Sequence, residues 1–241
     1  MSDRPGTTRR YGWWILLPAV ALLALTIALS AGALAPLPGD SALLRTVLAH
    51  RTAADVPAFR MVTATGTGAI PYLVTLGAGA LVLANHPFLT ARWPSGTRIA
   101  VAASGCVAWL ALGQAVRFGL MTVLARPRPP AEDWLTRASR YAYPSGHATT
   151  AAMAAGIVVV ALLLRRPRGH RYGIASAVCW AALVGVSRVR LGVHWPSDVL
   201  AGWLLATAWS ALGALCAAHW LYATDRSGHD AAPGPADRAP R

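Results

Sequence analysis

Six long apolar runs, separated by short polar stretches, dominate this chain of 241 residues. They lie at 13–35, 61–85, 99–125, 148–164, 172–187 and 199–222, and Arg117 interrupts the third. A helix that crosses the hydrocarbon core of a bilayer needs about 20 predominantly apolar residues. The pattern therefore predicts an all-α fold, a polytopic membrane bundle of six transmembrane helices. The fourth and fifth runs are short, so we expect their ends at the water interface or in a polar pocket.

The polar ends of the chain set the expected domain limits. We predict a cytoplasmic N-terminal segment at 1–12, one transmembrane domain at 13–222 and a disordered C-terminal tail at 223–241 that is rich in Pro, Gly, Ala and charge. The first run has an alternative reading, because Arg9 and Arg10 precede it and Ala33-Leu34-Ala35 is similar to a signal-peptide cleavage site. The run is long for a signal peptide, so we favour a retained helix.

Composition excludes two classes of protein. Hydrophobic residues make up 55% of the chain and charged residues 13%, whereas soluble domains carry about 25% charge and disordered chains have low hydrophobicity. The net charge of +13 is due to arginine alone, because the chain has no lysine. The arginines fall between the apolar runs, which favours a topological cause over a nucleic-acid partner.

The positions of the arginines predict the orientation. Three arginine-bearing segments share one side if the spans alternate: the N-terminus, the stretch after the second run and the stretch after the fourth. That side is expected to be the cytoplasm. We therefore predict a multi-pass protein of the cell membrane with both termini cytoplasmic. The segment after the third run lies on the opposite side, yet it also carries arginines, which indicates another role for them. These are Arg126, Arg128, Arg137 and Arg140.

Three polar clusters follow or precede the runs on this outer side. The first is Arg126-Pro127-Arg128-Pro129, the second is Pro144-Ser145-Gly146-His147, and the third combines Ser187-Arg188 with His194 and Asp198. Guanidinium groups, a hydroxyl and two imidazoles are suited to binding and transferring a phosphoryl group. The second cluster and Pro196-Ser197 are also helix-entry signals, and helix N-termini bind anions. Gly146 would allow a phosphate oxygen to approach the backbone closely.

Together the clusters resemble the tripartite signature of the type-2 phosphatidic acid phosphatase family, within the lipid phosphatase and vanadium haloperoxidase-like superfamily. The second and third motifs are complete, with His194 five residues after Arg188 and Asp198 three residues after His194. The first is partial, because Arg128-Pro129 matches but Met121 stands where the family has Lys. The resemblance implies an acid phosphatase/vanadium haloperoxidase-like helical core.

The resemblance also implies a mechanism without metal or cofactor. His194 would attack phosphorus to form a phosphohistidine, Asp198 would orient His194, and His147 would act as acid and then as base. The phosphate oxygens would be held by Arg128, Arg188, Ser145 and the Gly146 amide. We expect Arg126 or Arg117 to replace the missing Lys, and prefer Arg126 because it lies nearer the membrane surface.

The implied substrate is a lipid phosphate: phosphatidic acid, phosphatidylglycerol phosphate or undecaprenyl diphosphate. A lipid-linked phosphotransferase, with an alcohol as acceptor instead of water, is the alternative within the same chemistry. A transporter or channel is the alternative from another class, and it would spread its charges through the spans instead of gathering them at one face. A vanadate-dependent haloperoxidase fits six spans less well.

Overall fold

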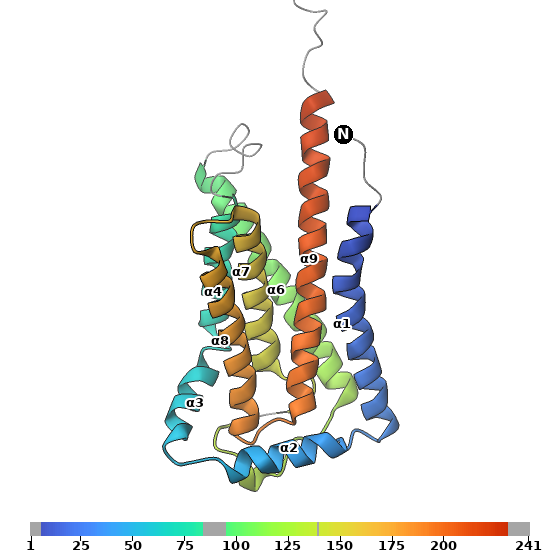
Figure 1. The fold of residues 1–241 in the computed structure, drawn as a ribbon, viewed down its shortest axis with the longest axis vertical. Helices are drawn as coiled ribbons and strands as arrows, with labels where there is room; N and C mark the ends of the chain where they lie inside the picture. Colours follow the sequence, from blue (N-terminus) through green and yellow to red (C-terminus); the bar gives the residue numbers. More distant parts are fainter. Residues whose placement is uncertain (1–5, 84–94, 139, 231–241) are drawn as a thin grey trace, which may run out of the picture.

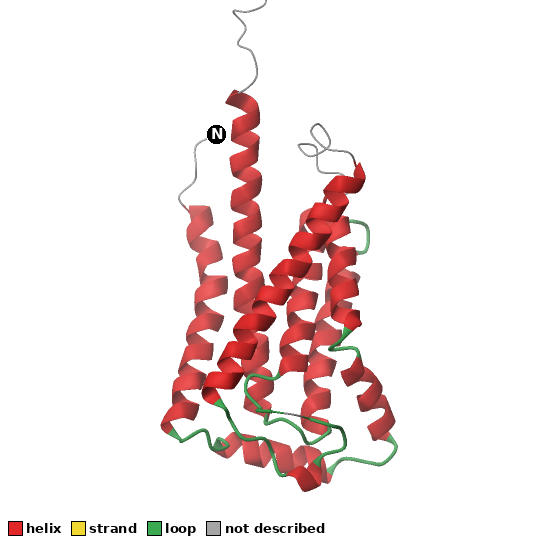
Figure 2. Cartoon of the chain, turned by 180° about the vertical axis from the view of Figure 1, so that it is seen from behind, coloured by secondary structure: helices red, strands yellow, loops and turns green. Residues whose placement is uncertain are grey.

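The computed structural model describes residues 6–83, 95–138 and 140–230, and within these ranges the regular structure is helical, without strands (Figures 1 and 2). The helices are α1 (Gly6–Ala31), α2 (Pro38–Ala49), α3 (Asp55–Ala64), α4 (Ala69–Leu83), α6 (Ser95–Leu124), the 3-10 helix η1 (Ala131–Asp133), α7 (Gly146–Arg165), α8 (His170–Arg190) and α9 (Pro196–Asp230). The long helices lie side by side as a bundle, and α2 lies across one end of it (Figure 1).

The number of spans agrees with the sequence pattern, with one change. Among the described residues, five helices are long and apolar enough to cross a membrane, and α3 with α4 makes a sixth if the pair is counted as one broken span. The run at 61–85, expected as one helix, is divided by a 52° bend between α3 and α4. Gly68 lies in the connection with a φ of +66°, a conformation that glycine adopts without strain. Residues 84 and 85 lie outside the described part.

Helical structure extends into both expected end segments. The predicted segment 1–12 is helical from Gly6, because α1 begins there. The predicted tail at 223–241 is helical as far as Asp230, where α9 ends. The remainder of the expected tail lies outside the described residues.

Helix α7 occupies the centre of the bundle, in contact with α4, α6, α8 and α9. Leu110, Met153 and Leu205 form a buried core between α6, α7 and α9. Glycine permits this close packing: a Cβ on Gly113 would lie 2.7 Å from Sδ of Met153. Many large apolar side chains instead point outward, among them Val123, which is 82% exposed. This surface suits contact with lipid.

The end of the bundle that α2 crosses gathers the polar clusters. Helices α6 and α8 end there, and α7 and α9 begin there (Figures 1 and 2). Leu44 fixes α2 to this end through a buried cluster that includes Val189 and Val199. The predicted meeting of the three clusters at one face is confirmed.

Candidate active site

The segment between α6 and α7 is anchored by hydrogen bonds along its length. Leu135 donates its backbone N–H to the carbonyl of Leu191 (3.0 Å), and Ala142 donates to that of Arg126 (2.9 Å). The indole of Trp134 donates to the carbonyl of Pro129 (3.0 Å). The first contact ties the segment to Leu191, just after α8, and the other two hold parts of the segment to each other.

A cavity of about 330 Å³ opens between this segment and the helix ends. Five of the predicted site residues line it: Arg128, Gly146, His147, Arg188 and His194. Its other lining residues include four that add charge or hydrogen-bonding capacity: Gln114, Arg117, Arg137 and Arg140. Arg137 and Arg140, for which the sequence indicated a role other than topology, therefore lie in the cavity wall.

His194 is held from both sides of its ring. Nη1 of Arg128 lies 3.0 Å from Nε2 of His194 and also donates to the carbonyl of Val193 (2.7 Å). Nδ1 lies 3.4 Å from Oδ2 of Asp198, which also accepts the backbone N–H of Trp195 (2.9 Å). A guanidinium has only donors, so Nε2 accepts and Nδ1 carries the proton. Asp198 thus both caps the start of α9 and faces the His194 ring.

The surroundings of His194 favour its neutral form. The ring is 2% exposed. Burial, together with the positive charges of Arg128 and Arg188, holds the pKa of His194 well below its usual range. Burial likewise lowers the pKa of Arg128. A neutral imidazole with an unprotonated Nε2 has the lone pair that a nucleophile requires.

Several buried polar atoms near the cavity have no hydrogen-bond partner within the described residues. They are Nε of Arg117, Oγ of Ser145 and Nε of Arg188. Ser145 precedes α7 as its N-cap, but its hydroxyl makes no capping bond and is not part of the cavity lining. Arg188 is held by Thr63, whose hydroxyl accepts from Nη1 at 2.9 Å. Unsatisfied buried donors of this kind suit an oxyanion.

Of the two arginines considered as substitutes for the missing Lys, Arg117 lines the cavity and Arg126 does not. A Cβ on Gly146 would lie 3.4 Å from Nη1 of Arg117, so this guanidinium lies beside the start of α7. It also reaches Sδ of Met121 at 3.3 Å, the position where the family has Lys. Arg126 is fully buried and is not part of the cavity lining. The preference for Arg126 as the phosphate-binding substitute is therefore not supported, because its terminal nitrogens are bound elsewhere.

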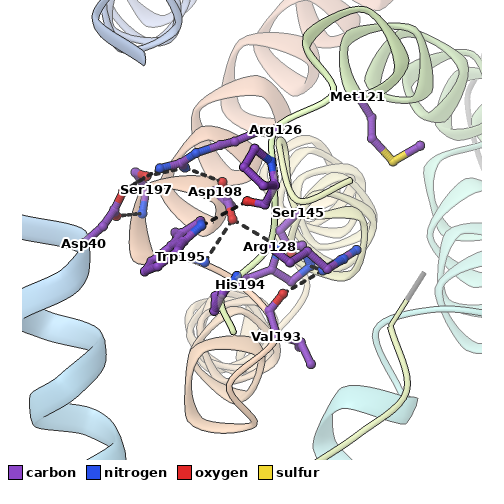
Figure 3. Close-up of polar contacts among 12 residues, drawn as sticks. Asp40, Met121, Arg126, Arg128, Ser145, Val193, His194, Trp195, Ser197 and Asp198 are labelled. Carbon is purple, nitrogen blue, oxygen red and sulfur yellow. Dashed lines mark hydrogen bonds and ion pairs between the residues drawn. The ribbon is translucent and has the colours of Figure 1, made fainter. Parts of the chain in front are cut away.

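The partners of Arg126 form a buried ion network (Figure 3). Nη1 donates to Oδ1 of Asp198 (2.5 Å) and to Oγ of Ser197 (2.8 Å), and Nη2 donates to Oδ2 of Asp40 (2.8 Å). Asp40 was missed by the sequence reasoning. Its signal was faint: a single carboxylate shortly after a proline, between two apolar stretches. Burial alone would raise the pKa of Asp40, but hydrogen bonds from Ser197 and Arg126 bring it below its usual range.

Comparison with known proteins finds a family that this chain resembles. The PAP2 superfamily profile matches residues 106–222. An undecaprenyl-diphosphatase of Sulfolobus acidocaldarius is 44% identical over 87 residues, which cover 36% of this chain and 34% of that protein. A phosphatidylglycerophosphatase B of Bacillus subtilis is 40% identical over 76 residues, which cover 30% of this chain and 36% of that protein. The matched part thus spans about a third of the length of these curated relatives.

The fold has a solved counterpart. The transmembrane PAP2-type phosphatidylglycerolphosphate phosphatase from Bacillus subtilis aligns with a TM-score of 0.67 and 21% identity, over 83% of this chain and 94% of that one. This likeness shows the fold. The family resemblance and the all-helical membrane fold expected from the sequence are thus confirmed, and the chain is a multi-pass membrane protein.

Proposed function

Residues 106–222 match the PAP2 superfamily, and from this premise we propose that the protein is a membrane phosphatase that hydrolyses the phosphomonoester or diphosphate of a lipid. The observation that carries the proposal is the cavity that both predicted catalytic imidazoles, His147 and His194, line together with Arg128 and Arg188. Such a set of cations binds a phosphoryl group and stabilises charge on it in the transition state.

The first step is attack by His194 on phosphorus. Arg128 transfers its hydrogen bond from Nε2 of His194 to a phosphate oxygen, which releases the lone pair. The new N–P bond forms as the bond to the lipid oxygen breaks, and His147 gives its proton to that oxygen. Asp198 accepts the hydrogen bond of the Nδ1 proton and stabilises the positive charge that develops on the ring.

The second step returns the enzyme to its starting state. His147, now neutral, takes a proton from a water molecule, whose oxygen attacks phosphorus. The N–P bond breaks, inorganic phosphate leaves, and His194 regains its lone pair. Throughout, the equatorial oxygens are held by groups that line the cavity: Arg117, Arg128, Arg188 and the Gly146 amide. Removal of one such donor typically costs about 10²–10³ in rate.

The proposed location of the site is the extracytoplasmic face of the cell membrane, with both termini in the cytoplasm. The support is the arginine distribution of the loops together with the cavity positions of Arg137 and Arg140, which account for the arginines of the opposite side. The helix α2 lies across the same end of the bundle (Figure 1). Because the cavity lies at this end of the bundle, an amphiphile anchored in the membrane would present its phosphate to it.

The test is phosphate release by the purified protein from phosphatidic acid, phosphatidylglycerol phosphate and undecaprenyl diphosphate, with His194→Ala beside it. We expect release from at least one lipid by the wild type and none by the variant. Release of free phosphate to water supports hydrolysis, whereas transfer to an added lipid alcohol would support the phosphotransferase. Turnover by His194→Ala equal to that of the wild type would contradict the proposal.

A further inference from the structure

Asp40 has no place in the proposed mechanism, yet short contacts connect it to the nucleophile. It lies in the first turn of α2, 3% exposed, and its partners come from α9 and from the residues after α6. An ionised carboxylate is costly to bury unless it is paired and hydrogen-bonded. Its place beside the catalytic end of α9 therefore needs an explanation beyond the docking of α2.

We propose that Asp40 and Arg126 are positioning residues, which hold the Asp198 carboxylate in the orientation in which it accepts the Nδ1 proton of His194. The inference rests on the proposed function, because it assigns these residues to the setting of the nucleophile.

The first support is the geometry of Arg126. Its two terminal nitrogens bind different carboxylates, Asp198 through Nη1 (2.5 Å) and Asp40 through Nη2 (2.8 Å). The guanidinium is planar and rigid, so the two carboxylates are fixed relative to each other. All three side chains are almost completely buried, so water does not compete with these contacts.

The second support is the start of α9. Asp40 accepts the backbone N–H of Ser197 at Oδ1 (2.8 Å) and the Ser197 hydroxyl at Oδ2 (2.6 Å). Ser197 directly precedes Asp198, and a carboxylate at a helix N-terminus stabilises that helix end. Asp40 thus binds the turn that carries Asp198 as well as the arginine that binds its side chain (Figure 3).

The third support is the charge balance. Two carboxylates share one guanidinium, so the trio of Asp40, Arg126 and Asp198 carries a net charge of about −1 when all three are ionised. His194 gains positive charge as it bonds to phosphorus, and Asp198 lies beside it. Without the charge of Asp40 the trio would be neutral and would stabilise the charged ring less. The effect is strong in a buried site, where screening by water is weak.

The experiment compares three variants of the full-length protein in detergent micelles. Asp40→Asn removes the charge while the shape is kept. Ser197→Ala removes the hydroxyl that Arg126 and Asp40 share, without a change of charge. Asp55→Asn is the matched control, because Asp55 is a carboxylate of α3 that pairs with Arg190 at the surface. The readouts are kcat and KM, and the ¹H NMR shift of the His194 Nδ1 proton in protein labelled with ¹⁵N-histidine, assigned by its loss in His194→Gln.

We expect Asp40→Asn to lower kcat by about 10–100-fold with little change in KM. This is the range seen when a residue that orients a metal-binding histidine is replaced. The Nδ1 proton should move upfield, because its bond to Asp198 weakens. Ser197→Ala should lower kcat and move the Nδ1 proton upfield by smaller amounts. It provides the test of the inference if Asp40→Asn does not fold. An unchanged Nδ1 resonance in these variants overturns the inference. If the resonance moves but the wild type hydrolyses no lipid phosphate, the positioning stands and the proposed function fails.

Discussion

Arg128 donates to His194 across 3.0 Å, from Nη1 to Nε2. Because arginine cannot accept a hydrogen bond, this contact fixes the tautomer of the ring, with its proton on Nδ1 toward Asp198. The nitrogen that faces the cationic cavity is then the unprotonated one. The proposed nucleophile and the proposed phosphate-binding guanidinium are thus in direct contact.

Arg117 should take over the role of the missing lysine. We expect Arg117→Ala to lower kcat/KM for a lipid phosphate on the order of 10²–10³-fold, because it removes a donor to the transferred phosphoryl group. Since Nη1 of Arg117 lies 3.3 Å from Sδ of Met121, the addition of Met121→Lys to Arg117→Ala should restore much of the loss. Steady-state kinetics of the single and double variants measure this. Full activity of Arg117→Ala would show that the cation is not used.

Arg126 should matter for stability as well as for rate. Arg126→Ala leaves Asp40 and Asp198 buried without their shared cation, and the loss of one partner from a buried ion pair costs about 3–5 kcal/mol. Thermal unfolding in detergent should show a large decrease in Tm. The control is Arg190→Ala, which breaks the partly exposed pair with Asp55 and should cost about 0–1 kcal/mol. Equal Tm values for the two variants would mean that the buried network adds no stability.

His194 should make the protein less stable in acid. Its folded-state pKa is depressed, so the unfolded chain binds a proton that the folded protein does not. The contribution is fully present above about pH 6.5 and decreases by about 1.4 kcal/mol per pH unit below it, until the folded pKa is reached. Tm at about pH 7.5 and about pH 5, compared between wild type and His194→Gln, measures this. The variant should lose less stability on acidification, and an equal loss would refute the assignment.

Chelators should leave the activity unchanged. The cavity wall presents several guanidinium groups, which repel a divalent cation and supply the positive charge that a metal would bring to phosphate. Phosphate release is measured with and without a chelator, and after dialysis against it. A loss of activity that added Mg²⁺ or Zn²⁺ reverses would contradict this account.

The sequence predicted the parts of the site whose geometry is local. His147 and His194 each adjoin the start of a membrane helix, and topology alone placed both starts at one end of the bundle. The direction of a side chain in an irregular segment could not be predicted. Ala125, just after α6, has a φ of +50°, and the chain then places Arg126 in the core and Arg128 in the cavity. Spacing along the chain carries no information about that reversal.

The contacts of Asp40 and the bend between α3 and α4 also could not be predicted from the sequence. The contacts of Asp40 with Ser197 join residues far apart in sequence, so no local pattern announces them. The run at 61–85 is apolar throughout, and hydropathy does not distinguish a straight helix from two helices at 52°. Both features depend on tertiary packing. For the bend, the packing of α3 includes the hydrogen bond from Arg188 of α8 to the Thr63 hydroxyl.

The most direct test of the account is to trap the phosphorylated enzyme. Protein mixed with a ³²P-labelled lipid phosphate is quenched in alkali, digested and mapped by mass spectrometry. The account predicts an acid-labile, alkali-stable phosphoryl group on His194, absent from His194→Ala. A wild-type enzyme that turns over with no label on His194, or a label on another residue that persists in His194→Ala, would contradict it.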